Sequence, residues 1–146
     1  MTDIASPLTG AVVALDDVSD DVFAERVMGD GVAVLPTDGT VVAPLEGNIA
    51  KLFEGGHAFA IENDAGLQVL VHVGIDTVHV KGEGFTVHAK EGDDVQAGDH
   101  IVTVDLHKMA VKSIDMTSPV VVISDHSPTV VAGKEVAAGD VLMSVE

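Results

Sequence analysis

Histidines are the residues of this chain whose type and spacing suggest chemistry most directly. Two of the seven, His57 and His72, stand in apolar segments, whereas most of the others are expected to be solvated: His79, His88, His100, His107 and His126. Two neighbouring imidazoles can bind Zn²⁺ with a carboxylate, act as general acid and base, or form a covalent phosphohistidine. Because cysteine is absent, a disulfide, a thiol nucleophile and a thiolate metal site are excluded.

The segment around His72 has the pattern of a β-strand. Alternation along residues 68–73 places the valines on one face and Leu70 with His72 on the other. His72 is therefore expected among apolar neighbours, opposite a core face made only of valine.

The segment around His57 predicts a second strand, in which His57 shares its face with Phe59 and Ile61. An Asn-Asp-Ala-Gly turn at residues 63–66 separates this strand from that of His72, so the two are expected to pair as a hairpin. Their pairing would bring both imidazoles onto one surface. Taken singly, each residue also fits a partly buried histidine hydrogen-bonded to a backbone carbonyl.

The sequence predicts that the elements that position these residues are mainly β-strands. Valine dominates the apolar set, Tyr and Trp are absent, and short apolar segments alternate with Gly, Pro, Asp or Asn turns. We expect an antiparallel β-sandwich or partly open barrel with one or two short helical turns. The expected helical segments are Asp20–Met28, with Ser19 as its cap, and Leu106–Ile114.

Two pairs of segments repeat along the chain and predict a duplicated hairpin motif. Residues 6–12 resemble residues 43–49 around a Pro-x-x-Gly core, and residues 91–99 resemble residues 132–140, each ending in Gly-Asp. In this interpretation the prolines start edge strands and the Gly-Asp pairs form tight turns. The alternative is that these short patterns recur by chance in a turn-rich β protein.

Charge and length exclude several classes of function. Lys and Arg number 7 against 24 Asp and Glu, and the net charge of −17 repels nucleic acid and anionic membranes. No hydrolase serine motif, phosphate-binding glycine loop or metalloprotease helix occurs, so self-contained nucleotide chemistry is unsupported. The acidity fits an acidic docking face or adaptation to a high-salt cytoplasm.

The chain is expected to form one domain spanning residues 1–146. Hydrophobic residues make up 47% of it, which is enough for a core. It shows neither a basic leader region nor an apolar run of about 20 residues, so a cytoplasmic protein without membrane insertion is expected.

Six segments, in order along the chain, resemble the glucose-family enzyme IIA of the bacterial phosphoenolpyruvate-dependent sugar phosphotransferase system. They are residues 22–33, 42–47, 57–61, 71–78, 81–85 and 117–121, and the most specific is His72-Val73-Gly74-Ile75-Asp76-Thr77-Val78 with the upstream His57-Ala58-Phe59. The resemblance implies an antiparallel sandwich built on a duplicated hairpin. It also implies a phosphoryl carrier, loaded by the phosphoprotein HPr and discharged to the IIB domain of a sugar permease.

The resemblance assigns roles to individual residues. His72 matches the phosphorylated histidine, His57 the partner that hydrogen-bonds the phosphoryl group, and Asp76 the acidic residue beside the active histidine. The family's docking rim corresponds to Asp20, Val22, Phe23, Val27, Met28, Phe53, Phe59 and Leu70. Two departures stand out: Gly55 replaces a common threonine, which removes a hydrogen bond to the site, and Leu70 replaces an aromatic residue.

Two other classes remain open on the residues alone. Residues 91–98 followed by residues 104–109 resemble a biotinyl or lipoyl domain, in which Lys108 would be the modified lysine on a hairpin tip. The other is a regulatory interaction module in which His57 and His72 bind Zn²⁺ weakly and target proteins dock. A phosphoryl carrier would require no cofactor, and its small apolar patch rimmed by Asp predicts a monomer.

Overall fold

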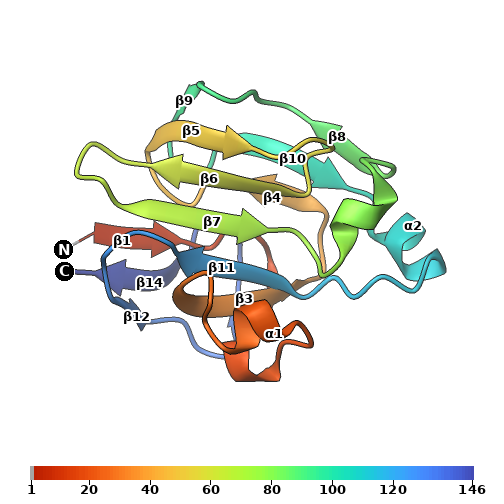
Figure 1. The fold of residues 1–146 in the computed structure, drawn as a ribbon, viewed down its shortest axis with the longest axis horizontal. Helices are drawn as coiled ribbons and strands as arrows, with labels where there is room; N and C mark the ends of the chain where they lie inside the picture. The colour runs from red at the N-terminus through yellow and green to blue at the C-terminus, as the bar shows by residue number, and fades with distance from the viewer. Residues whose placement is uncertain (1) are drawn as a thin grey trace.

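Residues 2–146, which the computed structural model describes, form fourteen short strands, two α-helices and two 3₁₀ helices (Figure 1). In chain order these are β1 (Thr2–Ala5), β2 (Gly10–Val13), η1 (Leu15–Asp17), α1 (Asp21–Ala24), β3 (Asp30–Pro36), β4 (Thr40–Val42), β5 (Gly47–Leu52), β6 (Ala58–Glu62), β7 (Gln68–His72), η2 (Thr77–Val80), β8 (Phe85–Val87), β9 (Asp94–Val95), β10 (His100–Val104), α2 (Leu106–Val111), β11 (Ser118–Val122), β12 (Pro128–Val130), β13 (Glu135–Val136) and β14 (Val141–Val145). None of the helices in this range is long and apolar enough to cross a membrane.

The strands pair antiparallel in three sheets. The largest has the order β13-β2-β3-β11-β7-β6-β5-β9, and two smaller sheets have the orders β1-β14-β12 and β4-β10-β8. The first and last strands, β1 and β14, pair with each other, so the chain ends lie side by side at one edge (Figure 1). This arrangement confirms the prediction of an antiparallel all-β fold with a few short helical turns.

Apolar side chains cover both faces of the large sheet. The main core lies between this sheet and the two smaller ones, and its buried members include Ile4, Leu8, Val34, Val41, Ile49, Phe59, Ile61, Val69, Val71, Ile101, Val120, Leu142 and Met143. On the opposite face an outer cluster packs beneath η1 and α1 and comprises Leu15, Val18, Phe23, Ala33, Ala58, Ala60, Leu70, Ile75 and Val121. Strand β7 confirms the predicted alternation, because Val69 and Val71 belong to the main core and Leu70 to the outer cluster.

The sequence repeat is a structural duplication. The Ala5 amide donates to the Pro44 carbonyl at 2.8 Å, and in the matching position of the second copy the Val42 amide donates to the Pro7 carbonyl at 2.9 Å. Likewise β2 pairs with β13 and β5 with β9. Hydrogen bonds that recur at corresponding positions contradict a chance resemblance. The prolines do not start strands, however, since β2 and β5 begin only at the following glycines.

The two predicted helical segments form, with different details. The first is shorter than expected and is capped by Asp20, whose carboxylate accepts the Val22 amide at 2.8 Å. The expected cap, Ser19, instead donates its hydroxyl to Asp115. Helix α2 confirms the second segment but ends at Val111 instead of Ile114, and it contains Lys108, which is therefore not on a hairpin tip as the biotinyl or lipoyl interpretation requires.

Candidate functional site

The β6–β7 hairpin brings the two histidines together, as its sequence predicted. Ala58 lies opposite His72 in the register, which places His57 at the open end of the hairpin beside it. The ring centroids of His57 and His72 are 5.4 Å apart, with 70° between the ring planes. The backbone joins them as well, because the Val73 amide donates to the His57 carbonyl at 2.7 Å.

The face predicted for His57 is wrong. Phe59 and Ile61 point into the main core, whereas the His57 ring lies against His72, on the outer side of the sheet. Strand β6 begins only at Ala58, so alternation does not extend to the histidine. Two glycines with positive φ precede His57 and turn the chain at this point.

A single hydrogen bond sets the tautomer of His72. Its Nδ1 lies 2.6 Å from the Gly74 carbonyl oxygen, which can only accept, so we assign the proton to Nδ1 and the free lone pair to Nε2. Gly74 has a φ of +79°, and a Cβ there would lie 2.6 Å from a methyl carbon of Thr77. Glycine is therefore required where the chain turns its carbonyl back to the imidazole.

Burial keeps both imidazoles neutral. It lowers the pKa of His72, against smaller effects of the Gly74 hydrogen bond and of the Asp20 and Asp76 charges, which raise that pKa. Burial also lowers the pKa of His57; the neighbouring His72 lowers it further, and a hydrogen bond to the Glu54 backbone raises it. The neutral imidazole is therefore the favoured form of both residues at pH 7.

Two phenylalanine rings border the histidine pair. The Phe23 ring lies 5.3 Å from the His72 ring, and Phe53 lies 5.7 Å from His57. Of the residues expected on the docking rim, four are exposed: Val22, Val27, Met28 and Phe53. Asp20 is half-buried and Asp76 is exposed, so carboxylates flank the apolar surface.

Three residues expected on the docking rim do not form its surface. Phe59 is 0% exposed and belongs to the main core, because the Phe59 side chain points to the inner face of β6. Phe23 and Leu70 are buried in the outer cluster, where they support the rim from below. The resemblance assigned these residues by their position in the chain alone, and both faces of β6 and β7 are covered in the fold.

Residues after β7 lie against the turn that precedes His57. A cavity of about 390 Å³ is lined by Glu54, Gly55, Val78 and Lys81. Gly55 has a φ of +91°, and a Cβ there would lie 3.0 Å from the Gly82 amide nitrogen, so a side chain at this position would be strained. Sequence reasoning missed Val78 and Lys81 as site residues, although both lie in or beside segments that carried the resemblance.

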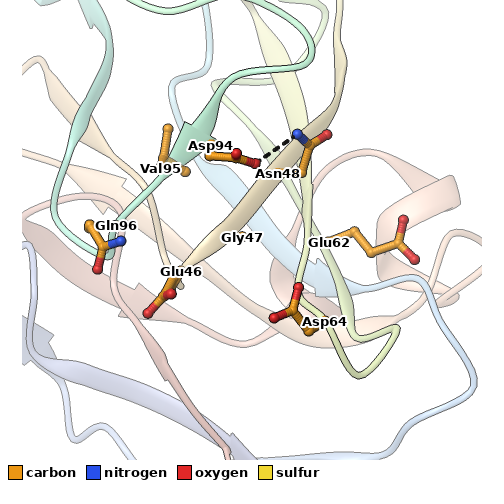
Figure 2. A pocket seen from close by; sticks show the side chains of 8 residues that line it. All are labelled: Glu46, Gly47, Asn48, Glu62, Asp64, Asp94, Val95 and Gln96. Atoms are coloured by element: carbon orange, nitrogen blue, oxygen red, sulfur yellow. Dashed lines mark hydrogen bonds between the residues drawn. The ribbon is translucent and has the colours of Figure 1, made fainter.

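Another groove lies at the opposite, turn end of the β6–β7 hairpin. Figure 2 shows its lining, in which the Asn48 amide donates to Asp94 at 3.1 Å and half of the residues are carboxylates: Glu46, Gly47, Asn48, Glu62, Asp64, Asp94, Val95 and Gln96. Between residues 2 and 146 no three His, Cys, Asp or Glu side chains are grouped to hold a metal ion. The Zn²⁺ site expected at His57 and His72 would thus have two ligands from this chain, which do not fit a closed tetrahedral site.

Fold and site together define a class of small antiparallel β proteins that carry two neighbouring histidines on one face of the large sheet. Residues 2–127 match the family described as phosphoenolpyruvate-dependent sugar phosphotransferase system, EIIA 1. This match covers most of the chain, which therefore belongs to the EIIA family of the phosphotransferase system. The biotinyl or lipoyl alternative finds no support in these relationships.

Individual relatives agree with the family. The glucose-specific EIIA component of Halalkalibacterium halodurans is 44% identical over 119 residues, which are 82% of this chain and 69% of that protein. The N-acetylglucosamine-specific EIICBA component of Klebsiella pneumoniae is 44% identical over 98% of this chain, which spans only 23% of that protein. The glucose permease IIA of Mycoplasma capricolum superposes with a TM-score of 0.93 at 36% identity, covering 97% of this chain and 94% of that one.

Proposed function

We propose that His72 accepts a phosphoryl group from phospho-HPr on Nε2 and passes it to the IIB domain of a sugar permease. The observation that carries this proposal is the 2.6 Å hydrogen bond from His72 Nδ1 to the Gly74 carbonyl. It leaves Nε2 unprotonated, so the new P–N bond forms as the donor P–N bond breaks, and no proton has to leave His72. The donor imidazole departs with its lone pair.

His57 is proposed to stabilise the transferred group. Its ring centroid lies 5.4 Å from that of His72, within reach of phosphoryl oxygens attached there. Phosphoryl transfer passes through a loose transition state, so alignment and neutralisation of charge matter more than a strong base. A phosphoryl dianion beside His57 favours the protonated imidazole and opposes the effect of burial on its pKa.

The surface around the pair suits partners with an apolar centre and basic surroundings. Exposed Val22, Val27 and Met28 supply the apolar area, while Asp20 and Asp76 supply negative charge at its border. Complementary charge accelerates encounters and makes them salt-sensitive, and a small interface keeps them short-lived. Phospho-HPr and the IIB domain are proposed to dock here in turn, in the cytoplasm.

The sugar is proposed to be selected by the permease rather than by this chain. A relative named for glucose and one named for N-acetylglucosamine are each 44% identical to it. Whether it acts as a free protein or as part of a longer permease, the same exposed face would serve both transfers.

Phosphorylation in a reconstituted system tests the assignment. The protein is incubated with phosphoenolpyruvate, enzyme I and HPr, and its intact mass is followed under conditions that preserve phosphohistidine. Wild-type protein should gain one acid-labile phosphoryl group, His72→Ala should gain none, and the control His107→Gln, on the exposed face of α2, should behave as wild type. Labelling that persists in His72→Ala would assign the nucleophile to another residue.

A further inference from the structure

Buried polar side chains gather around one turn beside the nucleophile. Among residues 2–146 the buried polar residues are Ser6, His57, Thr77 and Ser118. Three of these contact the turn that follows β7: His57 through its carbonyl, and Thr77 and Ser118 through their hydroxyls. Burying a hydroxyl costs free energy unless the hydroxyl is hydrogen-bonded, and the hydroxyls of Thr77 and Ser118 both make hydrogen bonds here.

Ser118 connects β11 to the turn through a fully buried hydroxyl. Its Oγ accepts the Gly74 amide at 3.0 Å and donates to the Met116 carbonyl at 2.7 Å. Because the hydroxyl proton is committed to Met116, a lone pair of Oγ faces Gly74. Ser118 and Gly74 are 44 residues apart, so the contact is a product of the tertiary fold.

Both the amide and the carbonyl group of Gly74 are hydrogen-bonded. Ser118 binds its amide, and His72 Nδ1 donates to its carbonyl. The flanking peptides are anchored too, since Thr77 Oγ1 donates to the Val73 carbonyl at 2.6 Å and the Ile75 amide donates to the Asp115 backbone carbonyl at 2.7 Å. Glycine has the widest backbone freedom of any residue, so this carbonyl stays aimed at the imidazole only while such anchors hold it.

We propose that Ser118 is a positioning residue for phosphoryl transfer: by holding the Gly74 amide, its hydroxyl keeps the Gly74 carbonyl aimed at His72 Nδ1 and so maintains Nε2 as the free nucleophilic nitrogen. Ser118 acts through Gly74 and touches no reacting atom. This inference rests on the proposed role of His72. It differs from that proposal in predicting a property of the unphosphorylated protein.

The matched control for Ser118 is Ser6. Both serines are 0% exposed, and Ser6 Oγ donates to the Leu8 carbonyl at 2.6 Å, much as Ser118 Oγ donates to Met116. Ser6 lies in the first repeat, where its amide donates to Asp140, and makes none of the contacts around Gly74. Replacing either serine by alanine removes one buried hydroxyl, so a general loss of stability is common to both.

The experiment compares Ser118→Ala, Ser118→Thr and Ser6→Ala by ¹⁵N NMR of the imidazoles and by phosphorylation kinetics with HPr. In wild type and Ser6→Ala, His72 should show one tautomer, protonated at Nδ1. In Ser118→Ala its two ring nitrogens should move toward averaged shifts, and the kcat for phosphorylation should fall on the order of tenfold or more with KM for HPr nearly unchanged. Ser118→Thr, which keeps the hydroxyl, should restore both properties.

The outcomes separate the two proposals. If Ser118→Ala keeps the tautomer and the kcat of Ser6→Ala, the inference about Ser118 is wrong. If wild-type protein is not labelled by HPr at all, the proposed function fails, while the NMR comparison still tests Ser118. Should Ser118→Ala not fold, Ser118→Cys provides the same test with a weakly bonding group of similar size, and an unchanged tautomer and kcat there would overturn the inference.

Discussion

At the scale of single residues, the two imidazoles differ in what holds them. The His72 ring is bonded through Nδ1 to Gly74 and covered by Phe23, whereas His57 follows two glycines and lies beside the exposed Phe53. This difference agrees with the separate roles proposed for them. A nucleophile requires a set orientation, and a group that supplies a hydrogen bond requires only proximity to the phosphoryl oxygens.

Replacing His57 should therefore impair one transfer more than the other. His57→Gln is expected to accept phosphate from HPr, since His72 is intact, but to pass it to IIB on the order of 10²-fold more slowly because a well-placed donor is lost. Rapid-quench measurement of each half-reaction checks this, with His107→Gln as the control. Equal rates of transfer to IIB in His57→Gln and wild type would contradict the role.

The lowered pKa values of both histidines predict a pH dependence of stability. Below pH about 6.5 the unfolded chain protonates His57 and His72, while burial keeps them neutral in the folded protein. Unfolding below that pH therefore takes up protons. The free energy of unfolding falls as the pH drops from about 6.5 toward the folded pKa values, and above about 6.5 these two residues cause no such loss. Urea unfolding at pH 7 and pH 5 should show a smaller loss for the double variant His57→Gln, His72→Gln than for wild type. An equal loss in both proteins would contradict the effect of burial.

At the scale of elements, Arg26 holds the segment that covers His72. It is the only arginine of the chain, and it bonds to Asp16 in η1 at 2.7 Å and to Asp30 at the start of β3 at 2.9 Å. The α1 segment lies between these points and carries the buried Phe23. The ion pairs are exposed, so their effect is modest and is screened by salt.

Loss of the two Arg26 ion pairs should affect the docking of HPr rather than the phosphoryl transfer step. Arg26→Gln is expected to raise KM for HPr roughly two- to fivefold at low salt with little change in kcat, because the rim loses order while the His72–Gly74 bond remains. Steady-state kinetics in low and molar KCl measure this, and the difference between variant and wild type should shrink in high salt. A fall in kcat with unchanged KM would show that Arg26 acts on the histidine pair itself.

At the scale of the whole molecule, the net charge of −17 has few compensating contacts. The ion pairs within residues 2–146 are five, all at the surface, and two of them share Arg26 while two share Glu83. Most carboxylates therefore face solvent without a basic partner. Self-repulsion of this kind opposes the compact state and is screened by added salt.

Salt should consequently stabilise the protein. The midpoint of thermal unfolding is expected to rise by about 4 °C or more between 20 mM and 1 M KCl, a change that calorimetry detects directly. The control replaces KCl by an equal osmolality of sucrose, which does not screen charge. A midpoint independent of KCl would limit the role of the acidity to docking.

The same charge is expected to keep the protein monomeric. The exposed apolar rim around the histidines is small and flanked by Asp20 and Asp76, so two copies would bring like charges together. Multi-angle light scattering at low and high salt should give the mass of one chain. A tight dimer that forms through Phe53 and Val27 would contradict this prediction.

Patterns among neighbouring residues were sufficient to predict much of this fold. Period-two alternation identified both faces of β7, the turn at residues 63–66 identified the hairpin that joins the histidines, and the two sequence repeats identified the duplicated strand pairs. These features follow from backbone geometry and turn chemistry, which short segments already contain. The resemblance to enzyme IIA identified the family, and the family match over residues 2–127 confirms it.

Features that depend on distant parts of the chain required the tertiary structure. Phe59 is buried because of what packs around it, and the His57 ring turns toward His72 because the chain bends before β6. The contact of Ser118 with Gly74 joins residues 44 positions apart, and neither residue carries a local signal of it. Alternation assigns a side chain to one of two faces, but only the packing of the sheets shows that both faces are covered and which buried hydroxyl meets which amide.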